Sequence, residues 1–300
     1  MKLVLPTPAG YVVAVSGGVD SIVLLDLLNE RTQAEAGWKL VVAHLDHGIR
    51  QDSKADRELV EAIARDYGLP FVYDSIGLGA GTSEATARKA RYKFLHTVAK
   101  ASGARGIIMA HHQDDVLETA IINILRGSGR KGLTSLSSRP DVVRPLLHVR
   151  KSELLDYAKA HNLKWREDST NQDETYLRNY VRHKLLPRFD SKARAKLLDS
   201  INNLRTTNNE LDTLLVNQLH FQSVKGSLDR AWFNHLPHDV AREVMAAWLR
   251  AHKLAGFDSK TLERLVVAAK VSSVGKSYPI QAGAAMKVSN KYLALQGAER

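Results

Sequence analysis

Short apolar runs alternate with longer stretches of helical periodicity along the first half of the chain. The apolar runs predict strands over residues 11–17, 39–47, 71–77, 106–112 and 141–147. The stretches that follow them predict helices over residues 20–30, 52–67, 83–101, 114–126 and 151–161. Continuous apolar strands that alternate with helices are typical of a parallel sheet covered on both faces. We therefore expect an α/β fold with a Rossmann-like parallel sheet.

The pattern changes after Pro187. Residues 191–220 predict one long helix or two short ones, and residues 237–254 and 259–270 predict two more. Residues 276–296 read as short strands with a glycine turn. We therefore expect a smaller, mixed α and β module at the C-terminus, with a boundary near residue 200.

Length and composition narrow the class of protein. With 300 residues the chain is long enough for two domains. It contains no cysteine, which excludes disulfides, thiolate zinc sites, iron–sulfur clusters and cysteine nucleophiles, and which favours a cytoplasmic location. No apolar run approaches the roughly 20 residues that span a bilayer, and the start lacks the features of a secretion signal. We expect no membrane partner.

The chain is basic, with 43 Lys and Arg against 32 Asp and Glu, and a formal net charge of +11. Residues 226–300 carry 11 basic and 6 acidic residues, which is the densest excess. Such a basic segment favours a polyanionic partner, most simply nucleic acid. The alternative is a basic surface that only keeps the protein in solution.

The stretch SGGVDS, residues 16–21, lies between the first expected strand and the first expected helix. Glycine lets a backbone approach an anion closely, and a helix N-terminus offers unpaired N–H groups. Ser16 and Ser21 add hydroxyl donors. Asp20 would repel phosphate unless a cation lay between them, which indicates Mg²⁺. The loop is neither a Walker A motif nor GxGxxG, and the alternative is simply a capped helix start.

This loop resembles the pyrophosphate loop of ATP pyrophosphatases. Six further stretches, in order, resemble the tRNA(Ile)-lysidine synthetase family: HLDHGIR (44–50), EATARKARYKFL (84–95), AHHQDDVLET (110–119), LRGSGRKGL (125–133), RPLLHVRKSEL (144–154) and WREDSTNQDETYLRNYVRHKLLP (165–187). The resemblance covers about residues 11–190. LP at 236–237 and YPIQAG at 278–283 weakly resemble the substrate-binding module of the family, whose longer members extend further.

The resemblance implies a reaction and its partners. ATP, with Mg²⁺, adenylylates the C2 oxygen of the anticodon wobble cytidine of isoleucine tRNA with a CAU anticodon, and pyrophosphate leaves. The ε-amine of free lysine then attacks C2 and expels AMP, giving lysidine. Residues 1–200 would form the catalytic domain and residues 201–300 a tRNA-binding or substrate-binding module. The oligomeric state stays open, with a homodimer as one alternative.

The resemblance also implies an ATP site made of the whole loop. Its members are Ser16, Gly17, Gly18, Val19, Asp20 and Ser21, with Asp20 as the metal ligand. The implied catalytic residues are Asp20, Arg91, His111, Asp115 and Glu118.

Asp115 and Glu118 share one helical face at the carboxyl end of the expected sheet. By resemblance this pair holds the lysine ammonium. The alternative is a capping carboxylate with a solvated glutamate. Of the two neighbouring aspartates, Asp114 fits the cap better than Asp115.

His111 and His112 stand beside two aspartates, a set that also suits zinc, but the resemblance places ATP there. We expect His111 to contact phosphate or the activated base, with a structural histidine as the alternative. Arg91 matches the arginine that precedes an aromatic in the family and is expected to bind nucleotide phosphates or substrate. For Arg88 an ordinary surface pair with Glu84 is the alternative.

Arg178, Arg182 and Lys184 lie on an expected helix with few acidic neighbours. We expect them to contact anticodon phosphates, the alternative being a solvated basic face. His44, Asp46 and His47, at the end of the second strand, lie near the expected adenosine pocket but receive no role.

Two other classes of function compete with the tRNA-modifying ligase. One is a small-molecule ATP pyrophosphatase of the NAD synthetase type, which would release pyrophosphate without tRNA. The other is a nucleotide-binding sensor without catalysis, which would not need the carboxylate pair Asp115 and Glu118.

Overall fold

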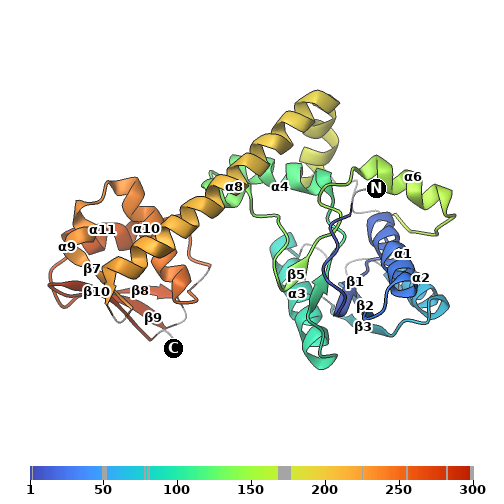
Figure 1. Ribbon diagram of the computed structural model, residues 1–300, viewed down its shortest axis with the longest axis horizontal. Helices are drawn as coiled ribbons and strands as arrows, with labels where there is room; N and C mark the ends of the chain where they lie inside the picture. Colours follow the sequence, from blue (N-terminus) through green and yellow to red (C-terminus); the bar gives the residue numbers. More distant parts are fainter. Residues whose placement is uncertain are drawn as a thin grey trace. The chain divides into compact units, whose positions relative to one another are not determined.

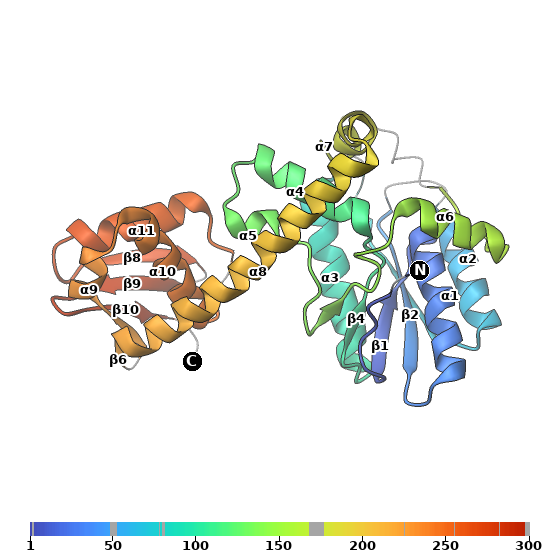
Figure 2. The same ribbon diagram turned by 45° about the horizontal axis from the view of Figure 1, so that its top comes forward.

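A computed structural model describes residues 1, 3–48, 53–77, 79, 82–167, 177–224, 226–254, 256–281 and 283–297. Parts of three family-like stretches, residues 49–50, 168–176 and 282, lie outside this set. The chain divides into two compact units, Met1–Asn203 and Leu204–Arg300 (Figures 1 and 2). The roles assigned to the two parts of the sequence stay predictions.

A parallel sheet forms the centre of the first unit. Its strands are β1 (Gly10–Ala14), β2 (Lys39–Asp46), β3 (Phe71–Ser75), β4 (Gly106–Ile108) and β5 (Val142–Val143). Their order is β3-β2-β1-β4-β5, and every neighbouring pair is parallel. The predicted sheet is confirmed. β4 is shorter than expected because the chain leaves the sheet after Ile108 and His112 already caps the next helix.

The helices of the first unit follow the strands. They are α1 (Val19–Ala34), α2 (Ser53–Asp66), α3 (Glu84–Ala101), α4 (Gln113–Leu125), α5 (Arg130–Leu133), α6 (Lys151–Ala160), α7 (Leu177–Tyr180), the π-helical turn η2 (Val181–Leu185) and the 3-10 turn η3 (Leu186–Arg188). The short elements α5 and η3 were not expected, because their apolar residues are too few to show a period. A helix was expected around Arg178, Arg182 and Lys184, and α7 and η2 occupy that stretch.

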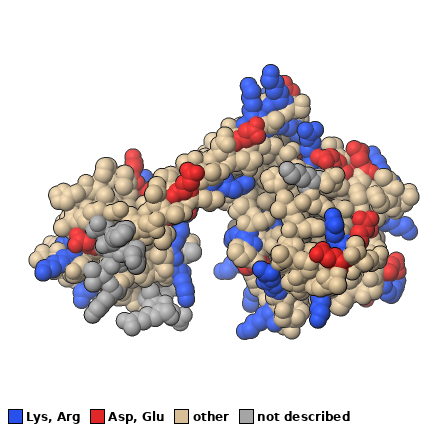
Figure 3. Space-filling model, in the orientation of Figure 1, with Lys and Arg blue, Asp and Glu red and all other residues tan. Residues whose placement is uncertain are grey.

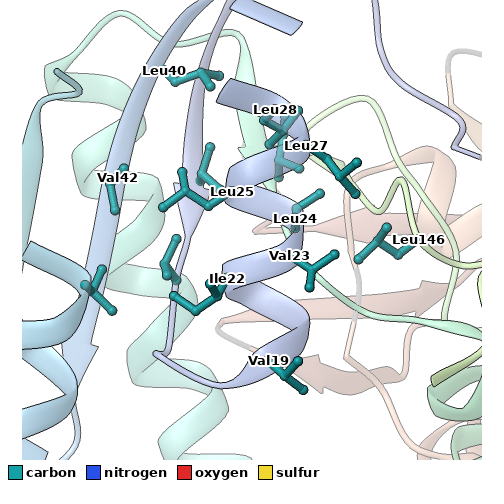
Figure 4. Close-up of a cluster of buried hydrophobic side chains, with 14 of the residues drawn as sticks. Val19, Ile22, Val23, Leu24, Leu25, Leu27, Leu28, Leu40, Val42 and Leu146 are labelled. Atoms are coloured by element: carbon teal, nitrogen blue, oxygen red, sulfur yellow. The ribbon is translucent and has the colours of Figure 1, made fainter. Parts of the chain in front are cut away.

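Alternate side chains of β1 pack on opposite faces of the sheet. Tyr11 and Val13 join a cluster with α1, whose apolar residues are buried on nearly every side (Figure 4). Val12 joins a second cluster with Leu95 and Val98 of α3. Because neighbouring strand residues point to opposite faces, these two clusters show that helices cover both faces, as predicted.

The second unit is a mixed module with its own core. Its sheet has the order β6-β7-β10-β9-β8 and is antiparallel. The strands are β6 (Ser223–Val224), β7 (Ser227–Asp229), β8 (Ser277–Gln281), β9 (Ala284–Val288) and β10 (Tyr292–Gln296), and the helices are α9 (Arg230–His235), α10 (His238–Ala251) and α11 (Ser259–Val271). The predicted mixed module is confirmed.

The stretch expected as one helix or two is a single helix, α8 (Ser191–Gln222), and the boundary between the units falls inside it. In its first half Leu197, Leu198 and Ile201 pack in a cluster with α4. In its second half Leu215 and Leu219 pack in the core of the second unit.

Candidate active site at the carboxyl edge of the parallel sheet

Two neighbouring strands, β1 and β4, end at the same edge of the sheet. The loop Ser16–Ser21 follows β1, and the start of α4 follows β4. Side chains from these segments meet there, at the edge where ligands bind in open parallel sheets.

The loop after β1 is shaped by its own hydrogen bonds. Gly17 has a φ of +93°, a left-handed conformation that favours glycine, and Gly18 is the residue before α1. The Ser21 hydroxyl donates to the Gly18 carbonyl at 2.8 Å and accepts from the Ser16 N–H at 3.2 Å. The Ser21 proton is therefore used within the loop, so the donors that the loop can offer a ligand are backbone N–H groups at the start of α1 and the exposed Ser16 hydroxyl.

An ion pair between the half-exposed Arg166 and the buried Asp56 supports the loop. The Arg166 N–H donates to the Gly17 carbonyl at 3.0 Å, and its Nε donates to Asp56 Oδ1 at 2.7 Å. A Cβ on Gly17 would lie 3.4 Å from the Asp56 Cβ. This pair was not predicted from the sequence, although Arg166 lies within a family-like stretch, because its partner is 110 residues away.

Asp20 connects the loop to two other elements. Its Oδ1 accepts from Lys151 Nζ, on α6, at 2.6 Å, and its Oδ2 lies 3.6 Å from His112 Nε2. Lys151 was not among the expected site residues.

The cap of α4 differs from the expectation. His112 is the N-cap and accepts from the Asp114 N–H at 3.3 Å, while Asp115 Oδ2 accepts from the His112 N–H at 2.9 Å. The capping carboxylate is thus Asp115 and not Asp114, because a residue at the third helical position can reach back to the N-cap N–H. Burial alone would raise the pKa of Asp115, but His112, His111, this N–H and Arg182 outweigh burial and lower it.

Glu118 is fully buried, so the alternative of a solvated glutamate is wrong. Arg182, on η2, binds it through Nε to Oε1 at 2.6 Å and through Nη2 to Oε2 at 3.0 Å. The same Nη2 lies 3.4 Å from Asp115 Oδ1. Burial raises the pKa of Glu118, and the two bonds from Arg182 oppose that rise. One guanidinium therefore links both carboxylates that were assigned to lysine.

The three residues assigned to tRNA do not form one solvated face. Arg178 pairs with Glu84 at 2.9 Å and lies 3.8 Å from Glu118. Arg178 and Arg182 thus face carboxylates, whereas Lys184 is exposed. Glu84 pairs with Arg178, and Arg88 instead lies over the Tyr92 ring, 5.0 Å from its centre.

His111 is held by an arginine that was not predicted from the sequence. Arg144 donates from Nε to His111 Nδ1 at 3.1 Å and from Nη2 to the Tyr92 hydroxyl at 2.8 Å. Burial lowers the pKa of His111 to about 3; Asp115 opposes the change, and Arg144 and other arginines support it.

Arg91 reaches the end of β2, where its Nη2 lies 3.4 Å from His47 Nε2. Burial, followed by Arg91, lowers the pKa of His47 to about 4. His44 donates from Nδ1 to the Val15 carbonyl at 2.9 Å, and Asp46 Oδ1 accepts from the Gly48 N–H at 2.8 Å. His44 and Asp46 therefore shape the backbone beside the loop, while Arg91 and His47 line the same edge.

Residues 4–189 match the family described as the PP-loop domain. This match covers more than half of the chain, and the chain belongs to that family. Membership implies the use of ATP.

The chain is also similar to curated tRNA(Ile)-lysidine synthases. It is 40% identical to that of Thermotoga maritima over 182 residues, which cover 58% of this chain and 44% of the relative. It is 42% identical to that of Thermus thermophilus over 188 residues, which cover 60% of this chain and 36% of the relative. The matched part thus spans less than half the length of either relative.

Among solved structures, the chain resembles the U34-tRNA thiolase NcsA from Methanococcus maripaludis with its [4Fe-4S] cluster. The TM-score is 0.54 at 19% identity, over 67% of this chain and 74% of that one. At this identity the likeness supports the fold alone.

No group of three or more His, Cys, Asp or Glu side chains in the described residues is arranged to hold a metal ion. No helix in that part of the chain is long and apolar enough to cross a membrane.

Proposed function

We propose that the chain joins lysine to C2 of the wobble cytidine of isoleucine tRNA with a CAU anticodon, through an adenylylated tRNA, in the cytoplasm. One observation carries the proposal: His112 Nε2 lies 3.6 Å from Asp20 Oδ2 and 3.6 Å from Asp115 Oδ2. This histidine joins the loop assigned to ATP to the carboxylates assigned to lysine. A ligase for two substrates needs these two sites to be adjacent.

The nucleotide half of the site suits ATP with Mg²⁺. The backbone N–H groups at the start of α1 would bind phosphate oxygens, and Ser16 is the exposed hydroxyl of the loop. Mg²⁺ in phosphate sites usually takes one or two carboxylates and the substrate phosphates, so Asp20 alone is a sufficient protein ligand. Bound there, Mg²⁺ would offset charge on the leaving pyrophosphate. Lys151, which pairs with Asp20 in this structure, would add a positive charge beside the leaving pyrophosphate.

The amine half of the site has the carboxylates to bind lysine, but Arg182 already occupies them. Both Glu118 oxygens and one Asp115 oxygen already face Arg182. A lysine ammonium would have to share these carboxylates with Arg182 or displace it. We therefore expect lysine to bind weakly until another ligand draws Arg182 away, and a tRNA phosphate has the charge to do so.

The basic surface supports tRNA as the polyanion. Figure 3 shows Lys and Arg side chains on the drawn faces of both units, and a group of them over the start of α8. In the second unit Arg242, Lys260 and Arg264, together with Glu263, line an open depression between α10 and α11. Arginine and lysine side chains on such surfaces bind phosphates and position the nucleic acid.

The experiment measures incorporation of radiolabelled lysine into isoleucine tRNA with a CAU anticodon, with ATP present, beside release of pyrophosphate. We expect both to require tRNA, and a transcript with a UAU anticodon to give neither. Pyrophosphate release from ATP and a small molecule without tRNA would instead support the NAD synthetase type of reaction. ATP binding with no turnover under any condition would support the sensor. Mass measurement in solution decides between monomer and homodimer.

A further inference from the structure

The contact between Arg144 and His111 determines where the ring proton lies. Arg144 Nε lies 3.1 Å from His111 Nδ1. A guanidinium has only donors and stays protonated in proteins, so Nδ1 must be the acceptor. The proton of the neutral ring is then on Nε2.

Arg144 itself is fixed on several sides. Its Nη2 donates to the Tyr92 hydroxyl at 2.8 Å, its Nη1 donates to the Ser137 carbonyl, and its backbone N–H donates to Ser138 Oγ at 2.9 Å. The side chain is nearly buried. Its Nε–H therefore keeps one direction, and it is aimed at the histidine.

The charged groups around His111 come from three elements. Asp115 faces it from α4, Arg88 and Arg91 face it from α3, and Arg144 faces it from the segment after β5. Asp115 favours a second ring proton, but burial and the arginines disfavour it. Among the described residues, His111 Nε2 has no hydrogen-bond partner. A neutral ring with a free Nε2–H thus stands at the edge where the loop and α4 meet.

We infer that Arg144 locks His111 in the neutral Nε2–H form, and that His111 donates this hydrogen bond to a phosphoryl oxygen of the nucleotide during adenylyl transfer. His111 then neither takes nor gives up a proton. It is the catalytic residue of the pair, and Arg144 is its positioning residue. The substrate in this inference rests on the proposed function, whereas the position of the proton does not.

The first test reads the proton directly. The full chain, with ¹⁵N in its histidines, is studied by NMR between pH 5.5 and 8, and His111→Gln identifies the signal. We expect a protonated Nε2, an unprotonated Nδ1, and no titration in this range. Arg144→Gln removes the fixed donor, and its amide oxygen can accept from Nδ1–H, so part of the His111 rings should carry their proton on Nδ1. Arg144→Lys keeps a donor and a charge and should keep the Nε2–H form. A wild-type His111 that titrates between pH 6 and 7, or that carries its proton on Nδ1, would overturn the inference.

The second test measures tRNA-dependent release of pyrophosphate, which should depend on the hydrogen bond donated by His111 Nε2–H. Gln places an N–H group near the position of Nε2, whereas Asn places its amide near Nδ1. His111→Gln should therefore keep activity within about tenfold of wild type, while His111→Asn should lose roughly a hundredfold or more, the usual effect of one lost donor. Equal losses in both variants would overturn the donor role.

The control is Arg139→Gln. Arg139 precedes β5, is exposed and pairs with Asp141 at 3.2 Å, so its loss should leave the pH profile unchanged. In contrast, Arg144→Gln should lower the rate of pyrophosphate release at every pH between 5.5 and 8, because part of the His111 rings would then carry their proton on Nδ1 and lack the Nε2–H. If the NMR result holds but the wild type releases no pyrophosphate with tRNA, the proposed function fails and the assignment of the proton stands.

Discussion

The two halves of the site hold charge in different ways. The loop after β1 is built from neighbouring residues, with a left-handed glycine, a serine bond within the loop and backbone donors. The start of α4 is built from charged side chains whose partners come from distant segments, including Arg144 and Arg182. A backbone loop presents donors with no flexible group to order when the ligand binds. A network of buried charges is adjustable but depends on every partner being present.

Loss of the Asp20 charge should have the largest effect, because Asp20 lies in the loop and also contacts His112 at the start of α4. Asp20→Ala removes the proposed Mg²⁺ ligand and the partner of Lys151. We expect tRNA-dependent pyrophosphate release to fall roughly a hundredfold or more, because charge on the leaving pyrophosphate is no longer offset. The measurement is Mg²⁺-dependent nucleotide titration beside release assays. Asp74→Ala, an exposed carboxylate at the end of β3, is the matched control. Unchanged Mg²⁺ dependence in Asp20→Ala would remove the metal role.

The carboxylate pair should affect lysine more than ATP. Glu118→Gln keeps the shape of the side chain and removes the charge. The lysine concentration for half-maximal lysidine formation should rise more than tenfold, since loss of one partner of a buried charge pair costs about 2–5 kcal/mol. Adenylylation should be mostly preserved.

Glu58→Gln, an exposed glutamate on α2 paired with Lys54, is the control for loss of one charge. Wild-type lysine dependence in both Glu118→Gln and Asp115→Asn would mean that the pair is structural and that lysine binds elsewhere.

The glycine of the loop allows backbone strain to be separated from function. Gly17→Ala and Gly68→Ala both place alanine at positive φ, +93° and +65°, and each should lower the free energy of unfolding by about 1–2 kcal/mol. The new Cβ would meet Asp56 at Gly17 but nothing within 4 Å at Gly68. Because both alanines have positive φ, thermal unfolding should show similar losses of stability. Because only Gly17 lies in the loop assigned to ATP, nucleotide titration should show weaker binding in Gly17→Ala alone. Equal nucleotide affinity in both variants would show that the loop tolerates a side chain at this position.

The smallest expected effect concerns acid stability. The pKa of His111 is about 3 and that of His47 about 4, both below the ordinary histidine value of 6.5. Between these values and 6.5 the unfolded chain binds protons that the folded chain does not, so stability is lost as pH falls through this range. Each histidine contributes at most about 1.4 kcal/mol per pH unit. Denaturant unfolding at pH 7 and pH 5 should show a smaller acid loss in His111→Gln and His47→Gln than in wild type, and an unchanged loss would contradict the buried neutral state.

The same contrast explains what could be predicted from the sequence. The sheet follows from apolar runs, and the loop follows from six adjacent residues. Arg144, Lys151 and Arg182 lie 33, 131 and 64 residues from His111, Asp20 and Glu118, so no local pattern connects them. The reversed cap at Asp115 has another cause: it depends on where β4 ends, and the apolar run predicted a longer strand.

The helix α8 contributes side chains to two cores, Leu197 and Ile201 to one and Leu215 and Leu219 to the other. Helix formation is cooperative, so turns lost at one end make the next turns easier to lose. Heat or a core substitution that melts one unit should therefore fray the shared helix from that side, and the two units should not behave as independent melting units. In hydrogen exchange, α8 amides near Asn203 would report the stability of whichever unit opens first.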